Sequence, residues 1–341
     1  MKTSDFDYHL PPSLIAQTPL ENRLGSRLLK VSKQSTVLED HSFSDLPSFL
    51  NAGDVLVLND SAVVPARLFG VKTDTNAVIE VLLLKPLGLK SYEALVKKSR
   101  KIDVGTTIKI GEGELYLTCT HVLDEGIRHF KMTYEGDFYH LLDRLGEMPL
   151  PPYIKEKLDD KDRYQTVYAK HKGSAAAPTA GLHFTMPFLE SLRQKGVEIT
   201  SITLHVGLGT FRPVKVDDVQ KHTMHEETYL ISEEAARIIN QARKEKRRII
   251  AVGTTVMRTL ETEMTLRDTF VKTERQSDLF IYPGFQFKAV DALITNFHLP
   301  QSTLLMLVSA FASKEIIFNA YHHAIKEKYR FFSFGDAMII L

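Results

Sequence analysis

The stretch "DVLVLNDSAVVPARLFG", Asp54 to Gly70, decides the fold of this 341-residue chain. Residues 54–58 are dominated by an apolar run that is typical of a short buried strand, and a polar loop follows at once. No helical pattern comes directly after this strand, so it has no local partner for a parallel sheet. We therefore predict that it joins a sheet built by the C-terminal half, and that the segment between is an insertion.

The segment after Arg67 has the pattern of a small β domain. Between residues 67 and 136, short runs rich in β-branched and aromatic residues are separated by turns such as "TDTN", "GEG" and "DEG". Strands at this spacing, without intervening helices, predict a small antiparallel barrel or sandwich. A short helix, "DFYHLLDRLG", then stops at Gly146, and the prolines of "EMPLPPYI" mark a domain junction.

From Tyr153 onward, strands and helices alternate, which implies right-handed crossovers. The predicted fold class is α/β: a mainly parallel sheet flanked by helices and interrupted by an inserted small antiparallel β-barrel domain. We expect a discontinuous α/β domain, residues 1–61 and 151–341, and a barrel domain, residues 62–150. Helices are predicted at 186–196, 233–246, 254–264, 303–312 and 314–328, and strands at 197–207, 248–253 and 292–297, with a last edge strand at 337–341.

Composition favours a soluble cytoplasmic protein. Hydrophobic residues make up 43% and charged residues 25%, no apolar run reaches the length of a membrane span, and the first residues resemble neither a secretory signal nor a transit peptide. The lone Cys119 excludes an intrachain disulfide framework. The net charge of +1 gives no global attraction to nucleic acid, so any such binding needs a local patch. No long heptad stands out, and a monomer is expected.

Polar, glycine-bearing loops follow four of the predicted strands. In open α/β sheets, ligands bind beyond the carboxyl ends of strands, so we expect these loops to form a shared site. In chain order they carry Asn59, Asp60 and Arg67; His205, Gly207, Gly209, Thr210 and Arg212; Gly253, Thr254, Thr255, Arg258 and Glu261; and Asn296, His298 and Ser302.

The run "SAAAPTAGLHFT", Ser174 to Thr185, has almost no large side chains before its histidine. Small residues let main-chain N–H groups approach a ligand closely. Thr179 and Gly181 are therefore candidates to line a pocket for a flat ring or a carboxylate, with His183 at its edge. The alternative is a tightly packed segment with a hydrogen-bonded core histidine.

Two further motifs were weighed against structural explanations. "GTTVMR" offers an anion or polar-ligand site at a helix N-terminus, or a plain helix cap with Arg258 and Glu261 as a surface pair. The Walker and dinucleotide patterns are absent, so a phosphate-rich cofactor is not favoured. "KHTMHEETY" lacks the HExxH spacing, and we predict no metal. Its His225 and Glu226 suit acid–base catalysis, and the alternative is an exposed turn.

Taken together, the motifs are similar to those of a known family. The stretches "NDSAVVPARLFG", "DRYQTVYAKHKGSAAAPTAGLHFT", "LHVGLGTFRPV", "HTMHEETY", "AVGTTVMRTLET", "LFIYPGFQF" and "TNFHLPQSTLLMLVSAF" closely resemble those of the S-adenosylmethionine:tRNA ribosyltransferase-isomerases, the queuosine-biosynthesis enzymes of bacteria. The resemblance runs from "FDYHLP" to "FFSFGDAMII", essentially the whole chain.

The resemblance implies a transferase. Its family transfers and isomerises the ribosyl part of S-adenosylmethionine onto 7-aminomethyl-7-deazaguanine (prequeuosine) at the wobble position of tRNA, giving epoxyqueuosine-tRNA, adenine and methionine. S-adenosylmethionine is then a consumed co-substrate, and no other cofactor, metal or redox centre is required. The family fold, an α/β domain interrupted by a β-barrel, agrees with the pattern described above.

The same resemblance suggests roles for particular residues. The base that attacks the acidic 5′ C–H is sought among His183, His205, His225 with Glu226, and His298. Asn296 or a second histidine would contact the departing adenine, and Arg212, Arg258 or the N–H groups of "TTVMR" would hold the methionyl carboxylate. The pocket-lining candidates add Thr179, Gly181, Gly207, Gly209, Thr210, Gly253, Thr254 and Thr255. The tRNA-binding candidates are Arg67, Lys97, Lys98, Arg100 and Lys101.

Two other functions stay open at this point. A hydrolase of adenosyl compounds would share the strand-end pocket but need no tRNA surface. A non-catalytic RNA-binding module built on the barrel would leave the histidine-bearing loops of the α/β domain unexplained.

Overall fold

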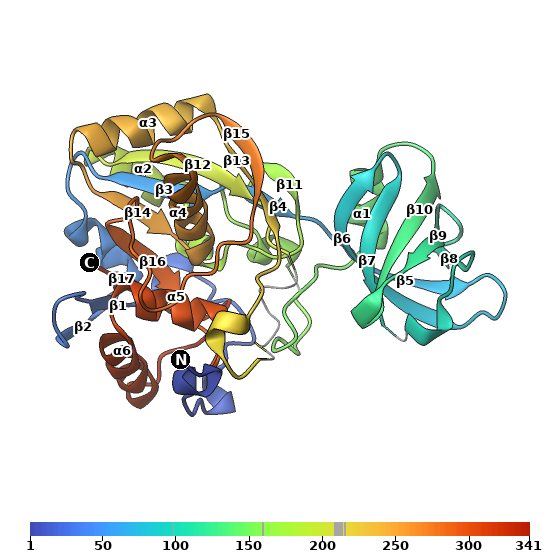
Figure 1. Ribbon diagram of the computed structural model, residues 1–341, viewed down its shortest axis with the longest axis horizontal. Coiled ribbons are helices and arrows are strands. Elements are labelled where there is room, and N and C mark those ends of the chain that lie inside the picture. Colours follow the sequence, from blue (N-terminus) through green and yellow to red (C-terminus); the bar gives the residue numbers. More distant parts are fainter. Residues whose placement is uncertain (98, 159, 208–213, 215) are drawn as a thin grey trace. The chain divides into compact units, whose positions relative to one another are not determined.

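The computed structural model describes residues 1–97, 99–158, 160–207, 214 and 216–341. The chain divides into two compact units (Figure 1). One comprises Met1–Ser61, Pro152–His171 and Ala177–Leu341, and the other comprises Ala62–Pro151 and Lys172–Ala176. The predicted division of the chain into domains, residues 1–61 with 151–341 and residues 62–150, stays a prediction.

The larger unit is built on a nine-stranded mixed sheet within the described residues. The early strand, β3, lies between β12 and β14 and pairs with both in parallel, as predicted for residues 54–58. In order across the sheet the strands are β15 (Thr273–Ser277), β13 (Glu227–Ile231), β12 (Glu198–Leu204), β3 (Val55–Asn59), β14 (Ile249–Val252), β16 (Ala292–Asn296), β17 (Ala337–Ile340), β1 (Arg27–Val31) and β2 (Leu38–Ser42).

Parallel pairing is less widespread than predicted. It joins β12, β3, β14 and β16 in the middle of the sheet, and β17 to β1. The pairs β15–β13, β13–β12, β16–β17 and β1–β2 are antiparallel. The prediction of 337–341 as an edge strand was wrong, because β17 lies between β16 and β1 and all four of its residues are buried.

Helices cover both faces of this sheet (Figure 1), and for that reason every residue of β3 is buried. On one face, Leu56 and Leu58 pack in an apolar cluster with Phe184 and with Leu189 of α2. Ser232 caps α3 through its hydroxyl, which accepts the N–H of Ala235, as the sequence predicts. The helices of this unit are α2 (Met186–Gln194), α3 (Glu233–Lys244), α4 (Thr254–Arg267), α5 (Thr303–Phe311) and α6 (Lys314–Lys326).

No single helix in the described part of the chain is long and apolar enough to cross a membrane, and α5 with α6 meets that test only as a pair bent by 116°.

The smaller unit contains a closed antiparallel barrel, which confirms the predicted insertion of a small β-barrel fold. Helix α1 (Phe138–Leu145) follows its last strand and stops at Gly146, where an added Cβ would lie 1.9 Å from the carbonyl oxygen of Pro65. Around the barrel the strands are β10 (Ile127–Tyr134), β7 (Ser91–Val96), β6 (Val78–Gly88), β5 (Arg67–Lys72), β8 (Thr107–Ile110) and β9 (Leu115–Val122). The strands β4 (Ser61–Val63) and β11 (His171–Ser174) pair in a two-stranded sheet. The chain leaves the larger unit for the smaller one within each of these two strands.

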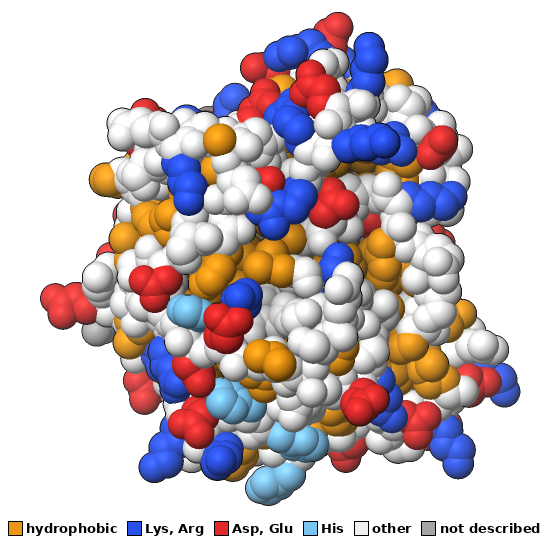
Figure 2. Space-filling model, turned by 90° about the vertical axis from the view of Figure 1, so that its left-hand side faces the viewer, with side chains coloured by type: hydrophobic (Ala, Val, Ile, Leu, Met, Phe, Trp, Pro, Cys, Tyr) orange, Lys and Arg blue, Asp and Glu red, His pale blue; other side chains and the backbone are white. Residues whose placement is uncertain are grey.

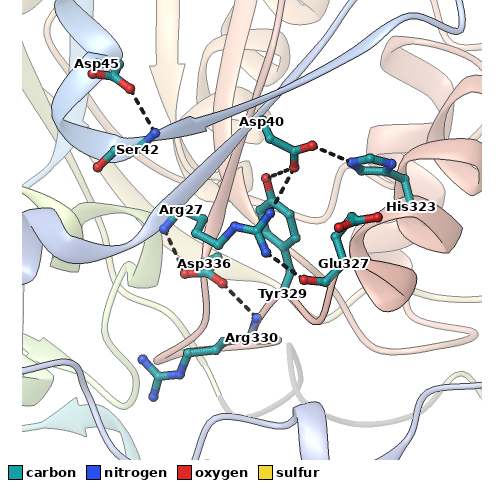
Figure 3. Close-up of polar contacts among 9 residues, drawn as sticks. All are labelled: Arg27, Asp40, Ser42, Asp45, His323, Glu327, Tyr329, Arg330 and Asp336. Carbon is teal, nitrogen blue, oxygen red and sulfur yellow. Dashed lines mark hydrogen bonds and ion pairs between the residues drawn. The ribbon is translucent and has the colours of Figure 1, made fainter.

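A polar cluster around Asp40 joins β2 to the C-terminal helix α6 and the segment after it (Figure 3). The Asp40 carboxylate accepts hydrogen bonds from Tyr329 Oη (2.5 Å), His323 Nε2 (2.9 Å) and Arg27 Nη2 (3.1 Å). The Arg27 guanidinium lies 3.7 Å from the centre of the Tyr329 ring. Four side chains from separate parts of the chain are thereby held together at this edge of the sheet.

Asp336, just before β17, anchors the neighbouring main chain (Figure 3). Its buried carboxylate accepts the N–H of Arg27 (2.9 Å) and the N–H of Arg330 (2.8 Å). Burial raises the pKa of Asp336, and these two N–H groups act against that rise. The position of the Asp336 carbonyl is therefore fixed, which matters for the site described below.

Replacing Asp40 with asparagine is expected to destabilise the protein in a pH-dependent way. Partial burial raises the pKa of Asp40, but hydrogen bonds from Tyr329 and His323 outweigh it and hold the pKa below its ordinary value. A carboxyl with a depressed folded pKa stabilises above its unfolded pKa, about 3.9, and this contribution is lost as the pH falls through the folded pKa. The thermal midpoint of Asp40→Asn should lie about 2 °C or more below wild type at pH 7, and the gap should shrink toward pH 3. An equal gap at both pH values would contradict the electrostatic explanation.

Candidate active site

The parallel strands β12, β3, β14 and β16 place their carboxyl ends at one edge of the sheet. Asn59, at the end of β3, ties two of these ends together. Its Oδ1 accepts the N–H groups of Leu204 (3.0 Å) and Ser61 (3.1 Å), and its Nδ2 donates to the Leu204 carbonyl (3.1 Å). The loops beyond this edge are therefore held close together, as the strand-end pattern predicts.

A cavity of about 670 Å³, partly open to solvent, lies at this edge. We call it the neutral cavity, because the described residues that line it have uncharged side chains apart from one histidine. They are Tyr153, Ala177, Pro178, Thr179, Ala180, Val206, Gly253, Thr254, Thr255, Thr295, Asn296, Phe297, His298, Leu299, Ser302, Leu304, Phe332 and Ser333. Seven of the residues predicted for the site are among them: Thr179, Gly253, Thr254, Thr255, Asn296, His298 and Ser302.

Gly253 makes the sharp entry from β14 into α4. Its φ of +93° is in the region that favours glycine, and it stands at the N-cap position of a 14-residue helix. The two threonines that follow, Thr254 and Thr255, both line the cavity. "GTTVMR" is thus both a helix start and part of the cavity wall.

A smaller pocket of about 320 Å³ adjoins the neutral cavity and shares Thr254, Thr255 and Leu304 with it. We call it the charged pocket, because Arg258 and Glu227 form an ion pair in its wall. Their side chains are only 6% and 3% exposed, and burial lowers the pKa of Arg258 to about 10. The N–H of Gly207 donates to Glu227 Oε1 (2.8 Å), while the Arg258 Nε has no hydrogen-bond partner among the described residues.

Of the sequence-based interpretations of this region, the surface pair of Arg258 and Glu261 was wrong, and the acid–base role of His225 and Glu226 stays a prediction. Arg258 and Glu261 are not a surface pair, because both are buried and Glu261 instead accepts the N–H groups of residues 288–290 at 2.9–3.1 Å. His225 and Glu226 are exposed and line neither the neutral cavity nor the charged pocket. The buried acid of "KHTMHEETY" is Glu227. The alternation of "ETYLI" was the available indication, because it places Glu227 on the same face as Tyr229 and Ile231.

His298 is the candidate histidine that lines the neutral cavity. Its Nε2 lies 3.1 Å from the Thr295 hydroxyl. Buried tyrosines hold its main chain on both sides, since Tyr8 Oη donates to its carbonyl (2.5 Å) and its N–H donates to Tyr321 Oη (2.8 Å). Burial lowers the pKa of His298 to about 3, so the imidazole is neutral at pH 7.

His183 lies behind Asn296. Its Nδ1 is 2.7 Å from the Ser26 hydroxyl, its Nε2 is 3.1 Å from Asn296 Nδ2, and its ring stacks on Phe43 with centroids 4.9 Å apart. Burial, aided by the positive charges of two nearby arginines, lowers its pKa to about 3. His183 is thus a hydrogen-bonded core histidine that touches a cavity residue, which combines both sequence-based interpretations.

The comparisons with known proteins agree with this geometry. The family sequence model described as "Queuosine biosynthesis protein" matches residues 3–340. A solved structure, described as an S-adenosylmethionine tRNA ribosyltransferase from Thermotoga maritima, is 40% identical, with a TM-score of 0.58, over 99% of this chain and 100% of that chain. The chain belongs to the queuosine biosynthesis family. It is a transferase with the α/β and β-barrel architecture of that family, which confirms the resemblance drawn from the sequence.

Other predicted residues of this family member lie outside the neutral cavity. His205 is half-buried, and burial together with the charge of His171 lowers its pKa. Gly181 is a packing glycine, because an added Cβ would lie 2.0 Å from Tyr168 Oη. Gly207 donates to Glu227 from the loop after β12. Three candidates, Gly209, Thr210 and Arg212, lie outside the described residues.

The predicted tRNA-binding residues differ in whether an acidic side chain lies next to their positive charge. Arg67 and Lys97 both face Glu80, at 3.7 and 3.0 Å, so their charges are partly neutralised. Arg100 and Lys101 are exposed in a single helical turn, and Lys98 lies outside the described residues. On the face of the molecule shown in Figure 2, cationic and anionic side chains are intermixed, without a continuous basic track.

Within the described residues, no group of three or more His, Cys, Asp and Glu side chains is placed to hold a metal ion. The absence of a metal requirement stays a prediction.

Glu227→Gln is expected to lower the free energy of unfolding by about 3 kcal/mol or more, because it leaves the buried Arg258 charge without its anion. Glu226→Gln, at the exposed adjacent position, is the matched control and should leave the thermal midpoint unchanged. Thermal melts of the three proteins at pH 7 measure the difference. Equal midpoints for the two variants would show that loss of the Glu227 carboxylate does not leave a costly unpaired charge at Arg258.

Proposed function

We propose that this transferase moves and isomerises the ribosyl group of S-adenosylmethionine onto 7-aminomethyl-7-deazaguanine at the wobble position of tRNA, releasing adenine and methionine and leaving epoxyqueuosine-tRNA. The observation that carries the proposal is an uncharged cavity beside a buried Arg–Glu pair, at the strand ends of a chain that matches the family from residue 3 to residue 340. S-adenosylmethionine is the co-substrate in this reaction, and no further cofactor is invoked.

The two neighbouring spaces suit the two ends of S-adenosylmethionine. The neutral cavity, with Ala177, Ala180 and Phe332 in its wall, fits the flat and uncharged adenosyl part. The charged pocket, with Arg258 and Glu227, fits the methionyl carboxylate and ammonium. Thr254 and Thr255 belong to both walls, which supports a position of the co-substrate in which its two parts meet near the N-terminus of α4.

His298 is the proposed base at the 5′ carbon. The adjacent sulfonium makes the 5′ C–H acidic, and a neutral imidazole has a free nitrogen lone pair to receive the proton. Of the histidines predicted for this role, His298 lines the neutral cavity and His183 is separated from it by Asn296. The tRNA surface is proposed to include Arg100 and Lys101. The cytoplasmic location and the monomeric state stay predictions from the sequence.

Mass spectrometry of tRNA nucleosides tests the reaction. The protein is incubated with S-adenosylmethionine and prequeuosine-containing tRNA, with unmodified tRNA as the control. We expect epoxyqueuosine together with equal amounts of adenine and methionine. Adenine without a nucleoside product would instead indicate a hydrolase of adenosyl compounds, and tRNA binding without turnover would indicate a binding module.

His298→Gln is expected to slow single-turnover transfer by about 10²–10⁴-fold, because glutamine keeps a hydrogen-bonding group near Thr295 but does not accept the proton. His225→Gln, at an exposed position, is the matched control and should react at the wild-type rate. A wild-type rate for His298→Gln would remove His298 as the base.

A further inference from the structure

Asn296 presents an unused hydrogen-bond acceptor at the wall of the neutral cavity. Its side chain is almost fully buried, with 2% of the residue exposed, yet its Oδ1 has no hydrogen-bond partner among the described residues. A buried acceptor without a partner is costly, because it has lost its hydrogen bond to water and gained none in return. Such an atom in a cavity wall indicates a ligand that supplies the missing donor.

The orientation of the Asn296 amide is set by two acceptors. Its Nδ2 donates to His183 Nε2 (3.1 Å) and to the carbonyl of Asp336 (3.4 Å). A carbonyl accepts only, so the amide nitrogen must face this side. The carbonyl is itself fixed, because the Asp336 carboxylate is held by the N–H groups of Arg27 and Arg330.

The tautomer of His183 follows from its other neighbour. The Ser26 hydroxyl donates its single proton to the carbonyl of Arg23 (3.2 Å), so it must accept from His183 Nδ1–H (2.7 Å). The proton of the neutral imidazole is therefore on Nδ1, and Nε2 is left as an acceptor for Asn296. A one-way series of hydrogen bonds thus runs from Asn296 through His183 and Ser26 to Arg23.

We propose that His183 is a positioning residue that holds Asn296 Oδ1 toward the neutral cavity, where it accepts an N–H of the 6-amino group of the co-substrate purine. This inference rests on the proposed function and deepens it, since it makes Asn296 a specificity-determining residue for an aminopurine. The uncharged lining favours the purine over the methionyl ammonium as the donor, because an ammonium group would lose its hydration here without gaining a carboxylate. The charged pocket supplies that carboxylate instead.

The test compares binding of S-adenosylmethionine and its 6-deamino analogue by equilibrium dialysis, with unmodified tRNA present so that neither ligand is consumed. Wild type should prefer the 6-amino compound at least tenfold. His183→Leu removes the acceptor for Asn296 Nδ2, and the preference should fall to threefold or less. His183→Gln should retain it, because the glutamine carbonyl replaces Nε2 as an acceptor.

Ser26→Ala extends the test beyond the cavity, because Ser26 does not line it. Without the Ser26 hydroxyl, the Nδ1–H tautomer loses its partner, and the preference should again fall. A merely structural role for His183 would weaken both ligands equally and leave their ratio unchanged, and thermal melts verify that each variant is folded.

A ratio near one in wild type, or a tenfold ratio kept in folded His183→Leu, would overturn the inference. A wild type that binds neither ligand would overturn both this inference and the proposed function. Transfer activity measured on the same preparations separates the two: an intact ratio without ribosyl transfer overturns the function alone.

Discussion

The parallel pairing of β3 with β12 on one side and β14 on the other is the constraint on which the rest of the molecule depends. The barrel segment follows the five residues of β3, and the strands that pair with β3 lie much later in the chain, at Glu198–Leu204 and Ile249–Val252. Because such contacts are non-local, the loop-closure entropy of the whole insertion must be overcome before the sheet exists. The strand ends that form the site are therefore assembled only when both halves of the chain have come together.

Apolar content explains which strands could be predicted from the sequence. Strands buried on both faces, such as β3, β14 and β16, are nearly continuous apolar runs and were found. The edge strands β2, "LEDHS", and β15, "TERQS", are polar, and only one of their ten residues is buried, so hydropathy alone does not separate them from loops. Strands that were not predicted also explain the error at β17. Its inner position depends on β1 and β2 lying beyond it, and neither was predicted.

Residues that line the cavity were predicted where their position along a strand decides that they line it. They were missed where the decision depends on side-chain partners. Four residues of the cavity wall lie at or just after strand ends, and the parallel register brings them together: Gly253, Thr254, Asn296 and His298. The sequence analysis selected Glu226 and not its neighbour Glu227, because which of the two is buried depends on which face of β13 meets α4. Hydrogen-bond direction, as at Ser26 and His183, is set by three-dimensional neighbours that no sequence pattern contains.

Buried charge on α4 shapes the charged pocket. Arg258, Glu261 and Glu263 all point into the protein, where each meets a defined partner: Glu227, the N–H groups of residues 288–290, and the Tyr229 hydroxyl at 2.5 Å. Buried ion pairs contribute little net stability, because desolvation offsets their attraction. The effect of the Arg258–Glu227 pair is geometric, since it joins β13 to α4 in the wall of the charged pocket.

The neutral cavity suits a reaction in which a positive charge moves without changing the total. In the proposed reaction, a bound sulfonium brings one positive charge beside uncharged described side chains. The proposed transfer of the 5′ proton to His298 moves that charge onto the imidazole and leaves a sulfonium ylide with no net charge. Burial lowers the pKa of His298 to about 3 in the free protein because it penalises the imidazolium, and it penalises a bound sulfonium for the same reason. A buried, neutral histidine in an uncharged wall is therefore well matched to a cationic co-substrate.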